Sequence, residues 1–239
     1  MIKLILFDLD GTLIDSLEDL AEAVNHALGL RGLPLHSVTE YRRMVGHGVR
    51  NLVKQALETP GQAGGDGKGS SVMPGHDNSV MPGSDRASDA LIDSALADFK
   101  AYYQAHIDVH TRPYPGIPEL LTDLQAHGIQ LAVASNKFQE GTEYLIQRFF
   151  PEIRFVAILG NRPGAPLKPD PEIVQEVLRK AHVQPADALL VGDSPTDMKT
   201  AANGGIESIA VTWGYRTAEE LAGHHQVHIV EELRNQLLK

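Results

Sequence analysis

Cysteine is absent from this sequence of 239 residues, so it offers no disulfide framework, no thiolate metal site and no cysteine nucleophile. It has no apolar run near the length of a membrane span and no N-terminal pattern of a signal peptide. Lysine and arginine form no run, and the formal net charge is −10. Because nucleic-acid binding needs clustered positive charge, we do not expect nucleic acid as a partner. Because the sequence has neither a membrane-span run nor a signal-peptide pattern, we expect no membrane partner and a cytoplasmic location.

The acidic balance of the chain constrains the way in which it could bind an anionic ligand. The overall field of such a protein repels an anion, so a metal ion or a few well-placed cations must hold it locally. The length allows one large domain, or a core domain with a smaller partner. Oligomeric state has no signature in the sequence.

Hydrophobic periodicity divides the chain into a helical part and an alternating part. Helices are predicted over 15–30, 38–57 (interrupted by two glycines) and 90–106. Further helices are predicted over 117–127, 141–148, 171–182 and 195–203, alternating with strands over 129–134, 153–159, 188–191 and 206–211. This alternation indicates an open, mostly parallel α/β sheet, with an inserted helical unit before it.

The segment 60–87 differs from its surroundings, because it is rich in Gly, Ser and Pro and repeats the string Ser-Val-Met-Pro-Gly at 71–75 and 79–83. Such a composition buries too little apolar surface to form a domain, which favours a flexible insertion. The alternative is a docking loop with Met73 and Met81 as apolar anchors.

Two carboxylates stand at the tip of the first predicted strand, where Ile2–Phe7 runs into Asp8-Leu9-Asp10-Gly11-Thr12. If the strand geometry persists, Asp8 and Asp10 leave on the same side, and they repel each other unless a cation or a shared proton intervenes. A calcium loop of the EF-hand type is excluded because its sixth position, Leu13, is not glycine. An ordinary polar turn remains the bland alternative.

Three more polar strings follow predicted strands in the same way. They are Ser135-Asn136-Lys137, Lys168-Pro169-Asp170-Pro171 and Gly192-Asp193-Ser194-Pro195-Thr196-Asp197. Each has a structural alternative when taken alone: turn residues for the first, a solvated lysine for the second, and a helix N-cap for the third. A purely structural role for all four strings is implausible, because each of them follows a predicted strand. Ligands bind at the carboxyl ends of the strands in such sheets.

The four strings together resemble those of the haloacid dehalogenase (HAD) superfamily of phosphatases. The resemblance implies a doubly wound, Rossmann-like parallel sheet of HAD type over 1–14 and 110–239, with an inserted α-helical cap domain over 15–109. It implies Asp8 as the nucleophile that forms an aspartyl-phosphate, and Asp10 as a general acid that becomes a base. An intact Asp10 favours a phosphatase over a dehalogenase.

The remaining site assignments also rest on the resemblance. It implies Mg²⁺ as the cofactor, held by Asp8, the backbone carbonyl of Asp10 and Asp193, with Asp197 orienting these ligands. The residues expected to hold the phosphoryl group are Thr12, Ser135, Asn136 and Lys168. The partner is then a small phosphorylated metabolite, because a cap closing over the site limits substrate size.

Three strings, at 45–50, 111–116 and 212–216, look like those of phosphoglycolate phosphatases. This resemblance favours 2-phosphoglycolate as the substrate. Arg43, His47 and Arg50 are the candidate specificity residues of the cap, with solvated helix and loop residues as the alternative. A β-phosphoglucomutase-like enzyme would carry a histidine where this chain has Leu20. A pyrophosphatase-like relative, or a catalytically retired module that binds a metal or a phosphometabolite, are further alternatives.

Overall fold

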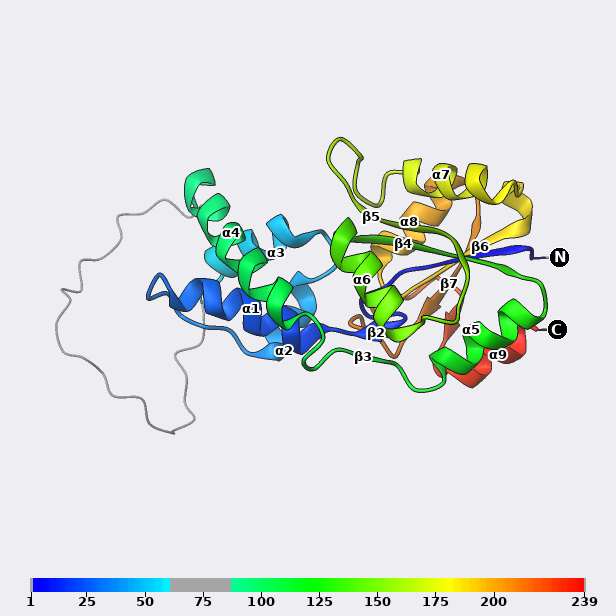
Figure 1. Ribbon diagram of the computed structural model, residues 1–239, viewed down its shortest axis with the longest axis horizontal. Helices are drawn as coiled ribbons and strands as arrows, with labels where there is room; N and C mark the ends of the chain where they lie inside the picture. The colour runs from blue at the N-terminus through cyan, green and yellow to red at the C-terminus, as the bar shows by residue number, and fades with distance from the viewer. Residues whose placement is uncertain (1, 61–86, 239) are drawn as a thin grey trace.

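A computed structural model describes residues 2–60 and 87–238 and shows two bodies joined side by side (Figure 1). One body is built around a six-stranded sheet, and the other is a group of helices. The insertion predicted over 60–87 lies outside the described residues except for its two end residues. Within the described part of the chain, no helix has the length and apolar character needed to cross a membrane.

The sheet has the order β5-β4-β1-β6-β7-β8, and every neighbouring pair is parallel. Its strands are β1 (Leu4–Phe7), β4 (Gln130–Phe138), β5 (Phe155–Asn161), β6 (Ala188–Gly192), β7 (Glu207–Val211) and β8 (Gln226–Val227). The chain adds strands on one side of β1 and then on the other, so the order reverses beside β1. Such a switch point opens a crevice at the carboxyl ends of the strands.

Strand β1 is apolar at every position because both of its faces are covered. Leu4 and Leu6 belong to the hydrophobic cluster under α7 and α8, whereas Ile5 and Phe7 belong to the cluster under α5, α6 and α9. Figure 1 shows α7 and α8 on one side of the sheet and α5 and α9 on the other. These helices are α5 (Ile117–Ala126), α6 (Gln139–Phe149), α7 (Glu172–Ala181), α8 (Pro195–Gly204) and α9 (Val230–Leu237). The predicted doubly wound α/β fold is confirmed.

The helical body consists of α1 (Leu17–Gly29), α2 (Val38–Met44), α3 (Val49–Glu58) and α4 (Asp89–His106). Tyr41, Phe99 and Tyr103 are fully buried in it. Two short strands, β2 (Ile14–Asp15) and β3 (Arg112–Pro113), pair antiparallel where the chain leaves the sheet body and returns to it. The helical body is therefore an insertion between β1 and β4, and we refer to it as the cap.

Some predicted boundaries agree with the observed ones and others differ. The interruption predicted within 38–57 is confirmed, because the chain leaves the helical conformation at Val45 and turns at Gly46 and Gly48, both of which have positive φ. Strand β4 continues to Phe138, with a change of register against β5 beyond Ala134. The first polar string follows its strand as expected, whereas the second, Ser135-Asn136-Lys137, lies inside β4.

Candidate active site

Three buried aspartates meet at the carboxyl ends of β1 and β6. Asp8 follows β1, and its backbone N–H donates to Val191 O of β6 at 2.9 Å. Asp193 follows β6 directly, so the pairing of the two strands brings these carboxylates together. One carboxylate oxygen from each of Asp8, Asp193 and Asp197 lies within 4.8 Å of the other two. This group of oxygen ligands could hold a metal ion.

Asp197 is positioned by the start of α8. Ser194 is the N-cap of this helix, and the two side chains form a capping box in which Asp197 Oδ2 accepts from Ser194 Oγ at 2.6 Å. Its other oxygen, Oδ1, accepts from Lys168 Nζ at 2.6 Å. Asp197 therefore both caps the helix and holds Lys168, and each of its oxygens has a donor.

Lys168 is buried, with 4% of its surface exposed, and its ammonium group joins the loop after β5 to this acidic group. Besides Asp197, its Nζ contacts Asp8 Oδ1 at 3.0 Å and Ala134 O at 2.8 Å. Burial lowers the pKa of Lys168, but the carboxylates of Asp197 and Asp8 raise it by more than burial lowers it. The net shift is therefore upward. The lysine is therefore a fixed positive charge beside Asp8.

One lysine does not balance three carboxylates. Burial raises the pKa of Asp8 to about 7, partly offset by Lys168, and burial with repulsion from Asp197 and Asp8 raises the pKa of Asp193 to about 8. Such shifts mean that the protein lacks a positive charge at this point. Hard carboxylate oxygens in a buried, over-negative group are the donor set that suits Mg²⁺.

Two glycines allow the close packing around Asp193. A Cβ at Gly11, where φ is +86°, would lie 2.3 Å from Asp193 Oδ2, and a Cβ at Gly214 would lie 2.5 Å from the same atom. The Tyr215 N–H donates to this oxygen at 2.7 Å, and Thr12 Oγ1 donates to Oδ1 at 3.4 Å. Thr12, expected at the phosphoryl group, thus contacts the Asp193 carboxylate.

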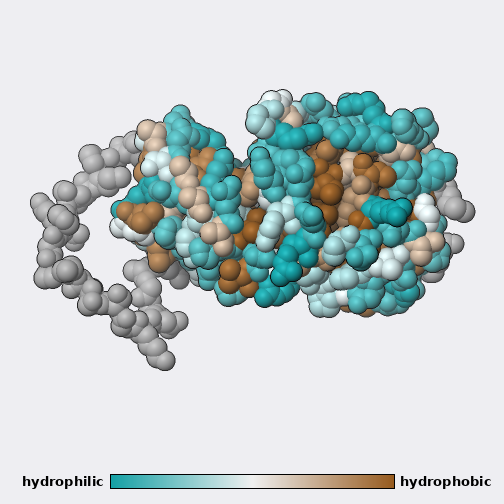
Figure 2. Space-filling model, in the orientation of Figure 1, coloured by the Kyte–Doolittle hydropathy of each residue, from teal (hydrophilic) through white to brown (hydrophobic). Residues whose placement is uncertain are grey.

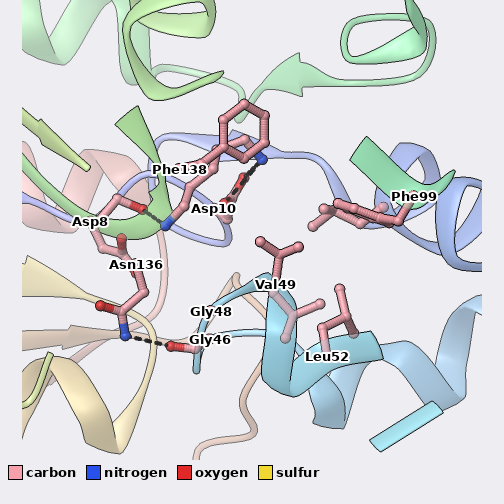
Figure 3. A pocket seen from close by; sticks show the side chains of 13 residues that line it. Asp8, Asp10, Gly46, Gly48, Val49, Leu52, Phe99, Asn136 and Phe138 are labelled. Carbon is pink, nitrogen blue, oxygen red and sulfur yellow. Dashed lines mark hydrogen bonds and ion pairs between the residues drawn. The ribbon is translucent and has the colours of Figure 1, made fainter. Parts of the chain in front are cut away.

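Asp10 lies apart from the three-aspartate group, in the loop beyond β1. Its Oδ1 accepts from Ser16 Oγ at 2.5 Å and from Lys137 Nζ at 3.1 Å. The strand has already ended at Phe7, so the two aspartates of the first string have different neighbours. Figure 3 labels Asp10 beside the pocket and marks a dashed contact from its carboxylate to a nitrogen atom.

Ser135 and Asn136 of the second polar string lie beside Asp8 and Asp10 in the lining of one cavity. Asn136 Oδ1 accepts from the Lys168 backbone N–H at 2.8 Å, and its Nδ2 donates to Lys168 O at 3.1 Å and to Gly46 O at 3.0 Å. Ser135 Oγ accepts from the Lys137 backbone N–H at 3.2 Å. Asn136 therefore fixes the Lys168 loop and contacts the cap, whereas a direct contact of either residue with phosphate stays a prediction.

A cavity of about 50 Å³ lies between the cap and the carboxyl ends of the strands (Figure 3). From the sheet body it is lined by polar residues, among them Asp8, Asp10 and Ser135. From the cap it is lined by apolar residues and two glycines, namely Leu20, Val45, Gly46, Gly48, Val49, Leu52 and Phe99. Figure 2 shows the notch in the surface between the two bodies.

None of the three predicted specificity residues of the cap lines this cavity. Arg50 forms ion pairs with Asp89, at 2.9 Å, and with Asp93 of α4. Arg43 is exposed, and the ring of His47 lies 3.4 Å from Thr196 Oγ1. The cap side of the cavity is instead formed by apolar residues and glycines of α1, α3, α4 and the loop between α2 and α3.

The predicted site omits several polar residues that hold the two bodies together. Buried Arg216 donates to three backbone carbonyls at the end of α2: Val45 O at 2.7 Å, Arg43 O at 3.3 Å, and Arg42 O. In the opposite direction, Arg42 donates to Gly214 O at 2.7 Å. Lys137 donates to Tyr103 Oη of α4 at 2.6 Å. Lys137 and Arg216 each belong to one of the strings noted in the sequence, at 135–137 and 212–216. Their place in these strings was the sequence feature that could have identified them as site residues.

A family model for haloacid dehalogenase-like hydrolases matches residues 5–211. The chain therefore belongs to this family of hydrolases, and the family predicted from the four strings is confirmed.

Within the family, the chain is similar to phosphoglycolate phosphatases. It is 32% identical over 237 residues to phosphoglycolate phosphatase 1 of Pseudomonas aeruginosa, covering 98% of this chain and 78% of the relative. It is 34% identical over 212 residues to a phosphoglycolate phosphatase of Mesorhizobium japonicum, covering 89% of this chain and 83% of the relative. The crystal structure of a predicted phosphoglycolate phosphatase from Haemophilus somnus superposes with a TM-score of 0.79 at 26% identity, covering 98% of both chains.

Proposed function

We propose that this protein is a Mg²⁺-dependent phosphatase that hydrolyses a small phosphate monoester, 2-phosphoglycolate, through an aspartyl-phosphate on Asp8. The observation that carries the proposal is the buried group of Asp8, Asp193 and Asp197, in which one oxygen from each carboxylate lies within 4.8 Å of the other two and Lys168 contacts Asp8. The family and the similarity to phosphoglycolate phosphatases support it.

The metal ligands in this proposal are the Asp8 and Asp193 carboxylates and the backbone carbonyl of Asp10. Bound Mg²⁺ would supply positive charge to phosphate oxygens and to the carboxylate group, which is the charge that the protein lacks here. Asp197 then orients Lys168, since its Oδ1 accepts from Nζ at 2.6 Å.

Two displacements at phosphorus complete the reaction. In the first, an Asp8 oxygen bonds to phosphorus while the bond to the ester oxygen breaks, and Asp10 gives its proton to that oxygen. In the second, water bonds to phosphorus, Asp10 takes a proton from the water, and the bond to Asp8 breaks to release inorganic phosphate. Lys168 offsets charge on the phosphoryl oxygens throughout, because it is held beside Asp8.

The size and lining of the cavity favour a short leaving group. A cavity of about 50 Å³ closed on one side by apolar cap residues favours a small substrate. Among the described residues that line the cavity, Lys137 carries the one cationic side chain, which supplies positive charge beside Asp10. A mutase-like reaction finds no acid or base at Leu20, which contributes an apolar wall.

The test is a panel of kcat/KM values, measured with Mg²⁺ on phosphoglycolate, pyrophosphate, hexose phosphates and nucleotides. We expect phosphoglycolate to exceed the others by about 10-fold or more. Preference for another substrate would overturn the choice of phosphoglycolate, and no phosphate release from any of them would indicate a retired binding module.

The same panel includes two Asp→Asn variants. Asp8→Asn removes the nucleophile, so we expect no release from any substrate with an unchanged circular dichroism spectrum. Asp89→Asn, at an exposed residue paired with Arg50, is the matched control and retains activity. Activity retained in Asp8→Asn would exclude an aspartyl-phosphate at this residue.

A further inference from the structure

We propose that Lys137 is a positioning residue that holds the carboxylate of Asp10 at the leaving group, and that Tyr103 of the cap holds Lys137 for this task. The inference rests on the proposed phosphatase function. The juxtaposition that carries it is a buried chain of contacts from Asp10 through Lys137 Nζ to Tyr103 Oη, across the boundary between the two bodies.

Each of the two aspartates of the first string contacts a different lysine: Asp8 contacts Lys168, and Asp10 contacts Lys137. Lys168 Nζ lies 3.0 Å from Asp8 Oδ1, and Lys137 Nζ lies 3.1 Å and 3.3 Å from the two oxygens of Asp10. Lys137 thus approaches both oxygens of one carboxylate. A lysine placed only to attract phosphate would not need this arrangement at the acid.

Lys137 is itself fixed from the cap side. Its side chain is 3% exposed, Nζ donates to Tyr103 Oη at 2.6 Å, and it lies 4.7 Å from the centre of the Tyr103 ring. Tyr103 is fully buried, stacked on Phe99 and edge-on to Phe138. A tyrosine held on two sides by aromatic rings gives the ammonium group a defined position.

Asp10 needs such support because no regular element directs it. It lies beyond the end of β1, and its other side-chain partner is Ser16 Oγ, at 2.5 Å. Lys137, in contrast, belongs to β4, at the point between Ala134 and Phe138 where the register against β5 shifts. A positioned acid matters most when the leaving group cannot depart as a stable anion.

The test compares two substrates of similar size that differ in their need for an acid. Ethyl phosphate releases an alkoxide, which must receive the Asp10 proton as its bond to phosphorus breaks. Acetyl phosphate releases acetate, which departs without a proton. The quantity measured is kcat/KM, because it reports the steps through the first displacement and not the later hydrolysis of the aspartyl-phosphate.

We expect Lys137→Met to lower kcat/KM for ethyl phosphate by about 10- to 100-fold and that for acetyl phosphate by less than about 3-fold. Tyr103→Phe should show the same bias at about 3- to 10-fold, and it keeps the ring and hence the packing. Tyr102→Phe is the matched control on the same helix, since Tyr102 stacks on His26 and His106, and its rates should be unchanged.

Equal losses for the two substrates in Lys137→Met and Tyr103→Phe would overturn the inference and indicate a structural or phosphate-binding role. Unchanged rates in both variants would overturn it too. In either case, phosphate release from phosphoglycolate by the wild-type protein, assayed in parallel, leaves the proposed function standing. A wild-type protein that releases phosphate from none of phosphoglycolate, ethyl phosphate and acetyl phosphate refutes the proposed function and, with it, this inference.

Discussion

Asp8 and Asp10 are two residues apart in the sequence, yet their side chains have different surroundings. Asp8 lies with Lys168 and two further aspartates, in a group that could hold a metal ion. Asp10 lies with Lys137 and Ser16 at the edge of the cavity. Different neighbours suit the two different roles, attack and proton transfer, that we propose for this pair.

Magnesium binding is predicted at the residue scale. At a Mg²⁺ concentration 100-fold above its Kd, the wild-type protein should be stabilised by about 2.7 kcal/mol, measured as a rise in melting temperature over the metal-free protein. Asp193→Asn should lose most of this rise, because it removes a buried carboxylate ligand.

The matched control for this prediction is Glu22→Gln. Glu22 belongs to a second group of possible ligands, with Glu18 and His110, but that group is exposed. We expect the variant to keep the full rise in melting temperature. Loss of the rise in Glu22→Gln, or its retention in Asp193→Asn, would place the metal elsewhere.

Asp8, Lys168 and Asp193 could be predicted from the sequence because each follows a strand of strong pattern, and parallel strands end at one edge of a sheet. The partners of the cap residues could not be predicted in this way. Arg50 turns toward Asp93, 43 residues later in the chain, because the packing of α3 on α4 decides its direction.

At the scale of elements, the loop after β5 carries Lys168 and is held at two places. Asn136 bonds to the backbone of Lys168 from β4. Near the start of the loop, the Arg162 guanidinium pairs with Glu176 of α7 through two contacts, at 3.0 Å and 2.6 Å. Neighbouring elements thus fix the segment that brings the lysine to Asp8.

The ion pair in this loop predicts a pH dependence of stability. The Arg162 hydrogen bonds, helped by Lys180 and opposed by burial, lower the pKa of Glu176 from 4.5 to about 2. A pKa lowered on folding stabilises the protein fully above the unfolded value, near 4.5, and the stabilisation is lost as the pH falls toward 2.

Glu176→Gln tests this dependence. It should lower the free energy of unfolding by about 0.5–1 kcal/mol at pH 7, measured by urea denaturation, because a partly exposed ion pair contributes little more. The difference from wild type should shrink between pH 4.5 and pH 3. A difference that stays constant over this range would assign the effect to packing.

The alternation of helices and strands after residue 116 could be predicted because buried strands and amphipathic helices have distinct periods. The two-residue strands β2, β3 and β8 could not, since two residues carry no period. Strand β4 was predicted too short because polar Ser135, Asn136 and Lys137 resemble the start of a loop, although tertiary contacts satisfy them inside the strand.

At the scale of the whole molecule, the cap and the sheet body are joined by the β2–β3 pair and by side-chain contacts around the cavity. Arg216 and Arg42 bond to backbone carbonyls across the boundary in opposite directions, and Asn136 and Lys137 make further contacts to the cap. The residues that surround the proposed reaction therefore also hold the two bodies together. Closure of the cap and assembly of the site should depend on each other.

Arg216→Met tests this dependence. The guanidinium donates to three carbonyls at the C-terminal end of α2, where a positive charge also interacts favourably with the helix dipole. We expect kcat/KM for phosphoglycolate to fall by about 10-fold, and amide hydrogen exchange to become faster in α2 and the following loop but not in β1. Arg31→Met is the matched control, because the bonds that Arg31 makes to described residues, Ala27 O, Ser94 and Asp98, lie within the cap. It should reduce stability without changing exchange at the boundary, so equal effects of the two variants on kcat/KM would show that the contacts of Arg216 serve the stability of the cap and not its closure.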